Sequence, residues 1–193
     1  MRIACIGGGP AGLYFSISMK LLDPSCEVVV LERNKPDDTF GWGVVLSDET
    51  LENLHANDPI SAASIRKNFA YWDDIALHFR GERLVSTGHG FCGIGRKKLL
   101  MLLQERAHSL GVDLRYETEV ESAEAYRDEY DVVVANDGLN SKTRMLYKDT
   151  FKPAVDERLC QFVWLGTHQT FKDAFTFIFE ETKHGWVWVH AYQ

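Results

Sequence analysis

Three glycines near the start of the chain have the spacing that lets a backbone turn hold a phosphate group. Gly7, Gly9 and Gly12 follow a short apolar segment at 2–6 and open a helix-like segment at 10–22. In this pattern the first glycine makes a tight turn, the second lets a pyrophosphate approach the backbone, and the third lets the helix pack closely on the strand. The N-terminus of the helix then offers N–H donors and the positive end of its dipole to the phosphates.

A carboxylate in the next strand extends this pattern. Glu32 closes the apolar segment at 28–31 and stands 20 residues after Gly12 (32 − 12). There it can accept hydrogen bonds from a ribose, and it disfavours a 2′-phosphate. Together with Pro10 and Ala11, which begin the helix, these residues predict a dinucleotide site. A glycine-rich turn without a ligand is the alternative, and the pattern alone does not separate FAD from NAD.

A second turn of similar construction lies within 132–144, in the segment VVVANDGLNSKTR. An apolar strand ends there at Asp137 and Gly138, and Ser141 begins what resembles a helix rather than a return strand. If this strand and the first one belong to one parallel sheet, both turns lie at the edge where ligands gather. Two such turns suit a long folded ligand or two dinucleotides. An Asp-Gly turn with an exposed Arg144 is the alternative.

The rest of the chain supplies elements that could position these turns. The first two strands and the helix between them form a β-α-β unit. Beyond that unit, composition and periodicity predict a loop at 34–46, helices at 47–56, 60–69 and 96–110, a hairpin at 71–87, a glycine-rich loop at 88–95, and strands at 112–120 and 130–135. Gly111 is the predicted C-cap of the long helix. After Pro153 come three aromatic-rich strands, at 159–168, 174–181 and 185–192.

These elements predict an α/β protein with a Rossmann-like dinucleotide-binding fold and the start of an antiparallel sheet. The dinucleotide-binding domain would cover 1–70 and 88–152, with the hairpin at about 71–87 inserted between them. Residues 153–193 would begin an antiparallel sheet of a substrate-binding domain, and that sheet stops unfinished.

Composition argues against several other classes of function. The chain is 45% hydrophobic and 12% aromatic, as an ordinary globular protein is. Its net charge of −7 argues against nucleic acid or an anionic membrane as a partner, and no apolar segment is long enough to span a membrane. Cys5, Cys26, Cys92 and Cys160 are widely spaced, which predicts reduced thiols in a cytoplasmic protein and no metal site.

Four segments together resemble the FAD-dependent aromatic hydroxylases, the single-component flavoprotein monooxygenases. The segments are GGGPAGL at 7–13, ER at 32–33, IGRKKLLMLLQERA at 94–107 and ANDGLNSKTR at 135–144. The resemblance implies an FAD-binding fold in which the first motif binds the ADP half of FAD.

The same resemblance implies roles for further residues. Arg96 would approach the phosphate and ribityl chain of FAD, and Asp137 and Gly138 would touch both FAD and the path of NAD(P)H. Arg33 and Val120 would also bind the cofactor. NAD(P)H would be a co-substrate, and O2 and a small aromatic molecule would be the other reactants.

Longer segments point to one branch of the family. LERNKPDDTFGWGVVLSDETLENL at 31–54 and GHGFCGIGRKKLL at 88–100 are similar to the hydroxylases of aryl-CoA thioesters such as salicylyl-CoA. Hydroxylases of tryptophan-type substrates share GWGVV and HAY and are a more distant likeness. The family's third motif, a Gly-Asp near the flavin, occurs nowhere in the chain. A non-catalytic nucleotide-binding fragment is therefore an alternative, as is an NAD-dependent dehydrogenase that uses the first motif alone.

Several side chains could serve a substrate pocket, although the sequence predicts no catalytic base and no oligomeric state. Four aromatic residues could form one wall of the pocket or simply pack in the core of a sheet: Trp164, Phe177, Trp186 and Trp188. His89 and His190 could polarise a substrate or be structural. Trp42, between two glycines, could stack on the flavin, line the entrance or act as a buried staple under its loop.

Overall fold

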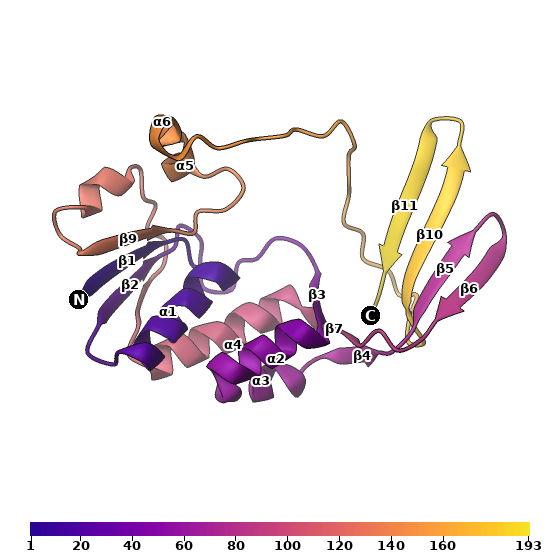
Figure 1. Cartoon of the computed structure of the whole chain (residues 1–193), viewed down its shortest axis with the longest axis horizontal. Helices are drawn as coiled ribbons and strands as arrows, with labels where there is room; N and C mark the ends of the chain where they lie inside the picture. Colours follow the sequence, from indigo (N-terminus) through magenta and orange to yellow (C-terminus); the bar gives the residue numbers. More distant parts are fainter. The chain divides into compact units, whose positions relative to one another are not determined.

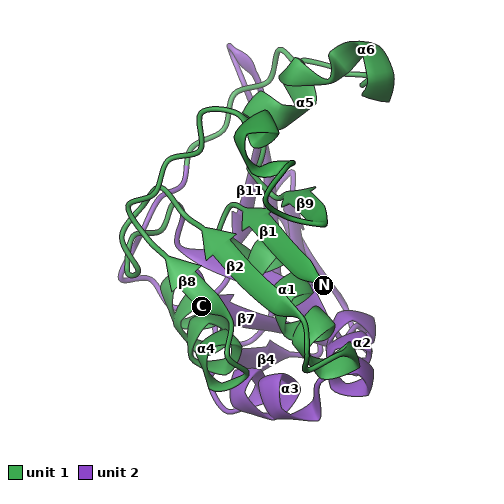
Figure 2. Cartoon of the chain, turned by 90° about the vertical axis from the view of Figure 1, so that its left-hand side faces the viewer, with its two compact units in different colours: residues 1–40, 97–163 green, residues 41–96, 164–193 purple.

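The computed structural model describes residues 1–193, which form two compact units (Figures 1 and 2). The first unit comprises residues 1–40 and 97–163, and the second comprises 41–96 and 164–193. These boundaries differ from the predicted domains, which assigned 41–70 and 88–96 to the dinucleotide-binding part. The difference arises because strands in those two segments pair with each other, as described below.

The first unit contains a four-stranded parallel sheet in the order β8-β2-β1-β9. Its strands are β1 (Arg2–Ile6), β2 (Glu27–Leu31), β8 (Asp113–Arg115) and β9 (Val132–Ala135). Helix α1 (Pro10–Leu22) connects β1 to β2. The predicted β-α-β unit and the Rossmann-like α/β class are therefore confirmed (Figure 1).

Apolar side chains explain why these elements form. Four of the five residues in β1 and four of the five in β2 are buried, so the apolar runs become strands covered on both faces. Helix α1 buries Leu13 and Ile17, which lie one turn apart on the same face. Helix α4 (Arg96–Ser109) follows its predicted bounds closely, and Gly111 after it has a φ of +79°, as a C-cap requires.

The predicted strand at 112–120 is much shorter than expected, because β8 ends at Arg115. Glu117 has a φ of +50°, which is incompatible with continuing the strand. The N–H of Thr118 instead donates to the carbonyl oxygen of Glu32 (2.9 Å). The chain therefore stays beside the end of β2 and then forms a short 3-10 turn at Ala123–Tyr126.

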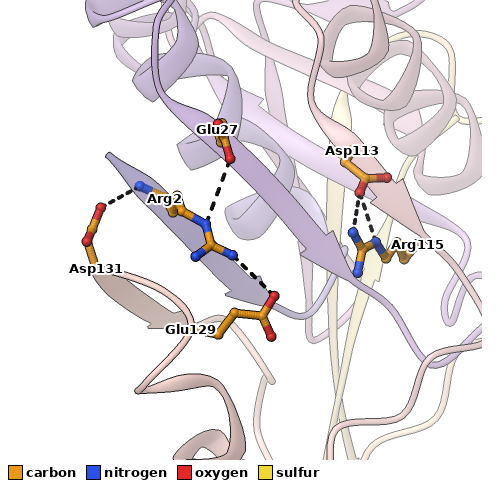
Figure 3. A network of polar contacts seen from close by, with 6 residues as sticks. All are labelled: Arg2, Glu27, Asp113, Arg115, Glu129 and Asp131. Atoms are coloured by element: carbon orange, nitrogen blue, oxygen red, sulfur yellow. Dashed lines mark hydrogen bonds and ion pairs between the residues drawn. The ribbon is translucent and has the colours of Figure 1, made fainter.

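Ion pairs join the amino ends of the strands, at the edge of the sheet opposite the glycine turn (Figure 3). Arg2 contacts Glu27 at 3.8 Å and Glu129 at 3.3 Å, and its backbone N–H donates to Asp131. A separate pair joins Arg115 to Asp113. All of the paired side chains are about half exposed or more, so the pairs contribute little to stability.

The second unit contains a three-stranded antiparallel sheet in the order β3-β7-β4. Its strands are β3 (Gly43–Ser47), β7 (Phe91–Gly95) and β4 (Ala70–Trp72). The sequence predicted loops where β3 and β7 lie, and that prediction is wrong for these residues. Their glycines suggested turns, but each strand is stabilised by pairing with the other, which local composition does not reveal.

Two helices follow β3 in this unit, α2 (Asp48–Asn57) and α3 (Pro59–Arg66). The side chain of Ser47 accepts a hydrogen bond from the N–H of Thr50 and caps α2, which begins one residue after the start of the predicted helix at 47–56. Asp58 caps α3 in the same way and is almost fully buried. The predicted pair of short helices is therefore confirmed, with the second ending at Arg66.

The other sheet of the second unit has the order β11-β10-β5-β6. Strands β5 (Ile75–Phe79) and β6 (Glu82–Ser86) form the predicted hairpin. Strands β10 (Phe175–Thr182) and β11 (Gly185–Ala191) form a second hairpin. Strands β10 and β11 pair antiparallel, as predicted, but the sheet that they join is mixed because β10 runs parallel to β5. The segment 159–168 finds no pairing partner and forms no strand.

Two short helices, α5 (Lys142–Leu146) and α6 (Lys148–Phe151), follow β9 in the first unit. No helix combines the length and apolar character needed to cross a membrane.

Candidate functional site

The glycine turn after β1 is shaped by its contact with the loop after β9. Gly7 has a φ of +103°, and its N–H donates to the carbonyl oxygen of Leu31 (2.8 Å). A Cβ on Gly7 would lie only 2.3 Å from the carbonyl oxygen of Asn136. Both the backbone angle and the close approach therefore require glycine at this position.

Gly9 and Gly12 have different surroundings. A Cβ on Gly12 would lie 2.0 Å from the carbonyl oxygen of Gly7, so only glycine lets α1 begin this close to the turn. A Cβ on Gly9 would meet nothing within 4 Å. Gly9 is the N-cap of α1, and no side chain caps that helix. The space over Gly9 is therefore open, next to an uncapped helix N-terminus.

The first turn of α1 leaves backbone donors for a ligand. Pro10 is the first helical residue and has no N–H, while the first N–H engaged in the helix is that of Leu13, which donates to Gly9 (3.0 Å). Ala11 and Gly12 thus have N–H groups without a helical acceptor. This end of the helix suits an anion, as the sequence predicted.

The carboxylate of Glu32 accepts a hydrogen bond from the glycine turn and can accept one more from a ligand. One carboxylate oxygen accepts the N–H of Gly8 at 2.7 Å. The other accepts the backbone and side-chain N–H groups of Asn34 at 2.8 and 2.7 Å. A carboxylate can accept about four hydrogen bonds, so Glu32 can still accept a ribose hydroxyl on the oxygen that faces Gly8.

Arg33 and Val120, the remaining predicted cofactor residues of this unit, differ in exposure. Arg33 is exposed, whereas Val120 is half-buried and packs against the core residues Ala4, Val29 and Leu31. Val120 also lines a cavity of about 350 Å³, together with residues of the 121–123 segment and α5.

The Asp-Gly turn lies beside the glycine turn, because β9 pairs in parallel with β1 and Ala135 lies opposite Ile6. The carboxylate of Asp137 accepts the N–H of Thr143 at 3.1 Å, and Gly138 has a φ of +79°. Burial opposes ionisation of Asp137, but hydrogen bonds from Ser141 and Thr143 outweigh it and hold its pKa below the ordinary value. Asp137 therefore organises its own loop.

Two cations belong to the helix after this turn. Lys142 contacts Glu119 at 2.9 Å and Glu121 at 3.0 Å, which fastens α5 to the segment after β8 and raises the pKa of Lys142. Arg144 donates to the carbonyl oxygen of Leu139, while its Nε is buried without a hydrogen-bond partner. The alternative of a freely exposed Arg144 is therefore wrong.

Arg96 and Trp42 belong to the second unit. The N–H of Arg96 donates to the carbonyl oxygen of Trp42 (3.0 Å), and Arg96 Nε is buried with no hydrogen-bond partner. The indole of Trp42 lies against Gly166 and is 69% exposed, which excludes the buried-staple alternative. Trp164 in turn lies against Gly41.

Aromatic side chains gather on one face of the mixed sheet in the second unit. Phe177 pairs with His190, and Phe179 pairs with Trp188, so these four side chains share a face. The His190 ring lies 4.3 Å from that of Trp188 and 4.8 Å from that of Phe177. Trp186 stacks on Phe79 at the same face, at 5.9 Å.

The Trp186 and Trp188 side chains are 52% and 59% exposed, so they are not ordinary sheet core. His89 is also exposed, and its ring forms a 2.7 Å hydrogen bond with Ser86. The contact with Ser86 supports a structural role for His89, whereas the ring of His190 contacts the rings of Phe175, Phe177 and Trp188.

Sequence reasoning missed Asn136, which it treated only as part of a tight turn. Its Nδ2 is buried without a hydrogen-bond partner, while its carbonyl oxygen approaches Gly7 and its Cβ lies near Gly12. The available signal was an amide side chain at the first position beyond β9, where the chain passes the glycine turn.

A comparison with protein families identifies the fold. The family model described as "FAD binding domain" matches residues 1–147. The chain is 45% identical over 192 residues to a salicyloyl-CoA 5-hydroxylase from a Streptomyces species, covering 100% of this chain and 37% of that protein. It is 33% identical over 197 residues to protodeoxyviolaceinate monooxygenase from Chromobacterium violaceum, covering 100% of this chain and 52% of that protein.

Solved structures agree at the level of the fold. A crystal structure of 2-methyl-3-hydroxypyridine-5-carboxylic acid oxygenase superposes with a TM-score of 0.66 at 24% sequence identity. The superposition covers 75% of this chain and 41% of that chain. The chain thus spans between about a third and a half of the length of the curated relatives it matches.

The residues present fit FAD. Open space over Gly9, an uncapped helix N-terminus and a spare acceptor position on Glu32 suit a pyrophosphate followed by a ribose. In the same unit, the buried and unpartnered Nδ2 of Asn136 is a further donor without an acceptor. The chain therefore belongs to the family of FAD-binding domains, and over its whole length it is similar to curated hydroxylases and monooxygenases.

Proposed function

We propose that this chain is the FAD-binding part of an NAD(P)H- and O2-dependent hydroxylase that acts on the aromatic ring of an aryl-CoA thioester. The observation that carries the proposal is the 45% identity to salicyloyl-CoA 5-hydroxylase over 192 residues. A CoA thioester of a hydroxylated benzoic acid, such as salicylyl-CoA, is the substrate class that this likeness supports.

The site geometry supports the proposed cofactor-binding roles. Gly9, Ala11 and Gly12 would hold the pyrophosphate with backbone N–H groups, and Glu32 would accept a ribose hydroxyl. The Nε of Arg96 is the available donor for the phosphate and ribityl part. When bound, FAD supplies the redox chemistry that takes electrons from NAD(P)H and passes one oxygen atom of O2 to the ring.

Arg33, Val120, Asp137 and Gly138 would support this binding less directly. Val120 lines the cavity beside α5, where a planar ring could lie against its side chain. Asp137 and Gly138 would shape the second turn rather than supply a free carboxylate, because Asp137 already accepts hydrogen bonds from its own loop.

The aromatic face of the mixed sheet supports an aromatic substrate. Phe177 and Trp188 offer ring surfaces, and the ring of His190 lies between them with its nitrogens free of side-chain acceptors. These side chains would orient the substrate ring and exclude water from the reacting position. His190 could also hydrogen-bond a phenol or amine on that ring.

The test is substrate-dependent oxidation of NADH or NADPH by the FAD-loaded protein. Salicylyl-CoA, free salicylate and CoA alone would be compared, with isotopically labelled O2 and mass spectrometry of the product. The proposal predicts that the thioester stimulates oxidation most and gains one labelled oxygen atom. Faster oxidation of NADH or NADPH with a tryptophan derivative would favour a hydroxylase of tryptophan-type substrates. FAD binding with no turnover on any aromatic compound would favour a non-catalytic nucleotide-binding fragment.

A cytoplasmic location belongs to the same proposal. All four cysteines are free, and three of them, Cys5, Cys26 and Cys92, are buried as thiols. Burial raises the pKa of Cys92 to about 11, so this thiol stays protonated and unreactive at neutral pH. Unpaired cysteines are typical of proteins in reducing compartments.

A further inference from the structure

Asn136 lies between the two turns that form the FAD site. Its N–H donates to the carbonyl oxygen of Ile6 at 2.7 Å, which continues the pairing of β9 with β1 by one residue. Its carbonyl oxygen closely approaches Gly7, and its Cβ lies 3.4 Å from where a Cβ on Gly12 would stand. The side chain therefore starts beside the first turn of α1.

The side-chain amide of Asn136 is left with a donor that nothing in the chain satisfies. Nδ2 is buried and has no hydrogen-bond partner. An unpaired buried polar group costs about 1–3 kcal/mol, and buried side-chain amides in folded proteins nearly always find an acceptor. A donor left unpaired beside a ligand site is best explained by an acceptor that the ligand brings.

The carboxylates of the two turns do not pair with the Asn136 amide. The oxygens of Glu32 accept from Gly8 and from Asn34, and Asn136 does not use the acceptor position that Glu32 has left. The carboxylate of Asp137, the next residue, is turned to its own loop through Thr143. Meanwhile the N-terminus of α1, which lies next to Asn136, favours an anionic group over another donor.

We infer that the side-chain amide of Asn136 donates a hydrogen bond to the pyrophosphate of FAD and is a cofactor-binding residue. It would add a side-chain donor to the backbone donors of α1, because the pairing of β9 with β1 brings Asn136 to the turn after β1. The inference rests on FAD binding at this site.

The experiment measures FAD affinity and the unfolding temperature of the FAD-free protein for three variants. Asn136→Ala removes the donor. Asn136→Asp keeps the size of the side chain and places a negative charge beside the pyrophosphate. Asn140→Ala is the matched control, since Asn140 is an exposed asparagine of the same loop. ADP competition against FAD then reports whether the affected contact belongs to the ADP half.

The inference predicts that Asn136→Ala weakens FAD binding about 10-fold, the equivalent of about 1.4 kcal/mol. Asn136→Asp should weaken it more strongly, ADP should lose affinity in parallel, and the FAD-free unfolding temperature of both variants should match that of the control. Unchanged FAD affinity in both Asn136 variants would overturn the inference, as would a lower unfolding temperature that accounts for the loss. If the unaltered protein binds no FAD, the family assignment of the site fails as well.

Discussion

Gly9 and Gly12 belong to one motif, but the fold requires glycine only at Gly12. A Cβ on Gly12 would collide with the carbonyl oxygen of Gly7, whereas a Cβ on Gly9 would enter open space. The backbone of Gly9, with a φ of −70° and a ψ of 178°, is one that any residue can adopt. Gly9 is thus required by the ligand, and Gly12 is required by the fold.

Replacing Gly9 with leucine should therefore abolish FAD binding and leave the fold intact, because the side chain would occupy the pyrophosphate position. Gly12→Ala should instead lower the free energy of unfolding by about 1–3 kcal/mol through overpacking. FAD titration and urea unfolding of both variants measure the two effects. A Gly9→Leu variant that retains normal FAD affinity would show that the pyrophosphate binds elsewhere.

Asp137 provides a test through pH. Its folded-state pKa lies below the ordinary value of 3.8, so its ionised form stabilises the folded protein above that value. This contribution is lost as the pH falls through the lowered pKa. Asn in place of Asp137 should reduce stability at neutral pH, and the difference from the unaltered protein should shrink in acid. Urea midpoints at neutral and at acidic pH measure this, and a difference independent of pH would count against the ionised carboxylate.

At the scale of elements, the sequence predicted those parts in which local composition and pairing agree. The apolar runs of β1 and β2 with the glycine turn between them predicted the β-α-β unit correctly. Strands β3 and β7 were missed because Gly43, Gly93 and Gly95 resemble turn residues. At Gly93 the absence of a side chain leaves room for the ring of Trp72, 2.6 Å from where a Cβ would stand.

For the site, too, the sequence predicted features that depend on local composition and missed those that depend on long-range contacts. Motif spacing predicted Gly7, Gly9, Gly12 and Glu32 as site residues, since their expected roles depend on the backbone turn and on the strand that follows it. It could not find Asn136, whose significance comes from an unpaired donor and from a neighbour more than 100 residues away in sequence. Long-range register and hydrogen-bond satisfaction are properties of the folded chain.

Trp72 should be a main anchor of the second unit. It is 2% exposed, contacts the rings of Phe175 and Tyr192, and donates through Nε1 to the carbonyl oxygen of Phe171 (3.1 Å). Trp72→Ala should lower the free energy of unfolding by about 3–5 kcal/mol. Trp186→Ala is the control, because that side chain is 52% exposed and should matter much less. Equal losses in urea unfolding would contradict this assignment.

Trp188 should serve the substrate rather than the fold. Its ring is 59% exposed and contacts Phe179 and His190 on the aromatic face. In the FAD-loaded enzyme, Trp188→Ala should raise the KM for the aryl-CoA thioester several-fold and leave FAD affinity unchanged. Steady-state kinetics measure the KM, and FAD titration measures the affinity for the cofactor. An unchanged KM would show that Trp188 does not contact the substrate.

At the scale of the whole molecule, we expect the two units to have different roles. The first unit holds the glycine turn, Glu32 and the Asp-Gly turn, and the second holds the aromatic face. The chain matches 37% of the length of salicyloyl-CoA 5-hydroxylase, and the hydroxylase activity remains part of the proposed function. FAD binding is the property that the described residues should supply themselves.

The most direct test of that claim is the visible absorption spectrum of the protein after incubation with FAD and removal of free cofactor by gel filtration. We expect the chain to retain FAD in about equal amount to protein, with a higher unfolding temperature because the ligand binds only the folded state. A colourless protein with an unchanged unfolding temperature, or one that binds NAD but not FAD, would contradict the account.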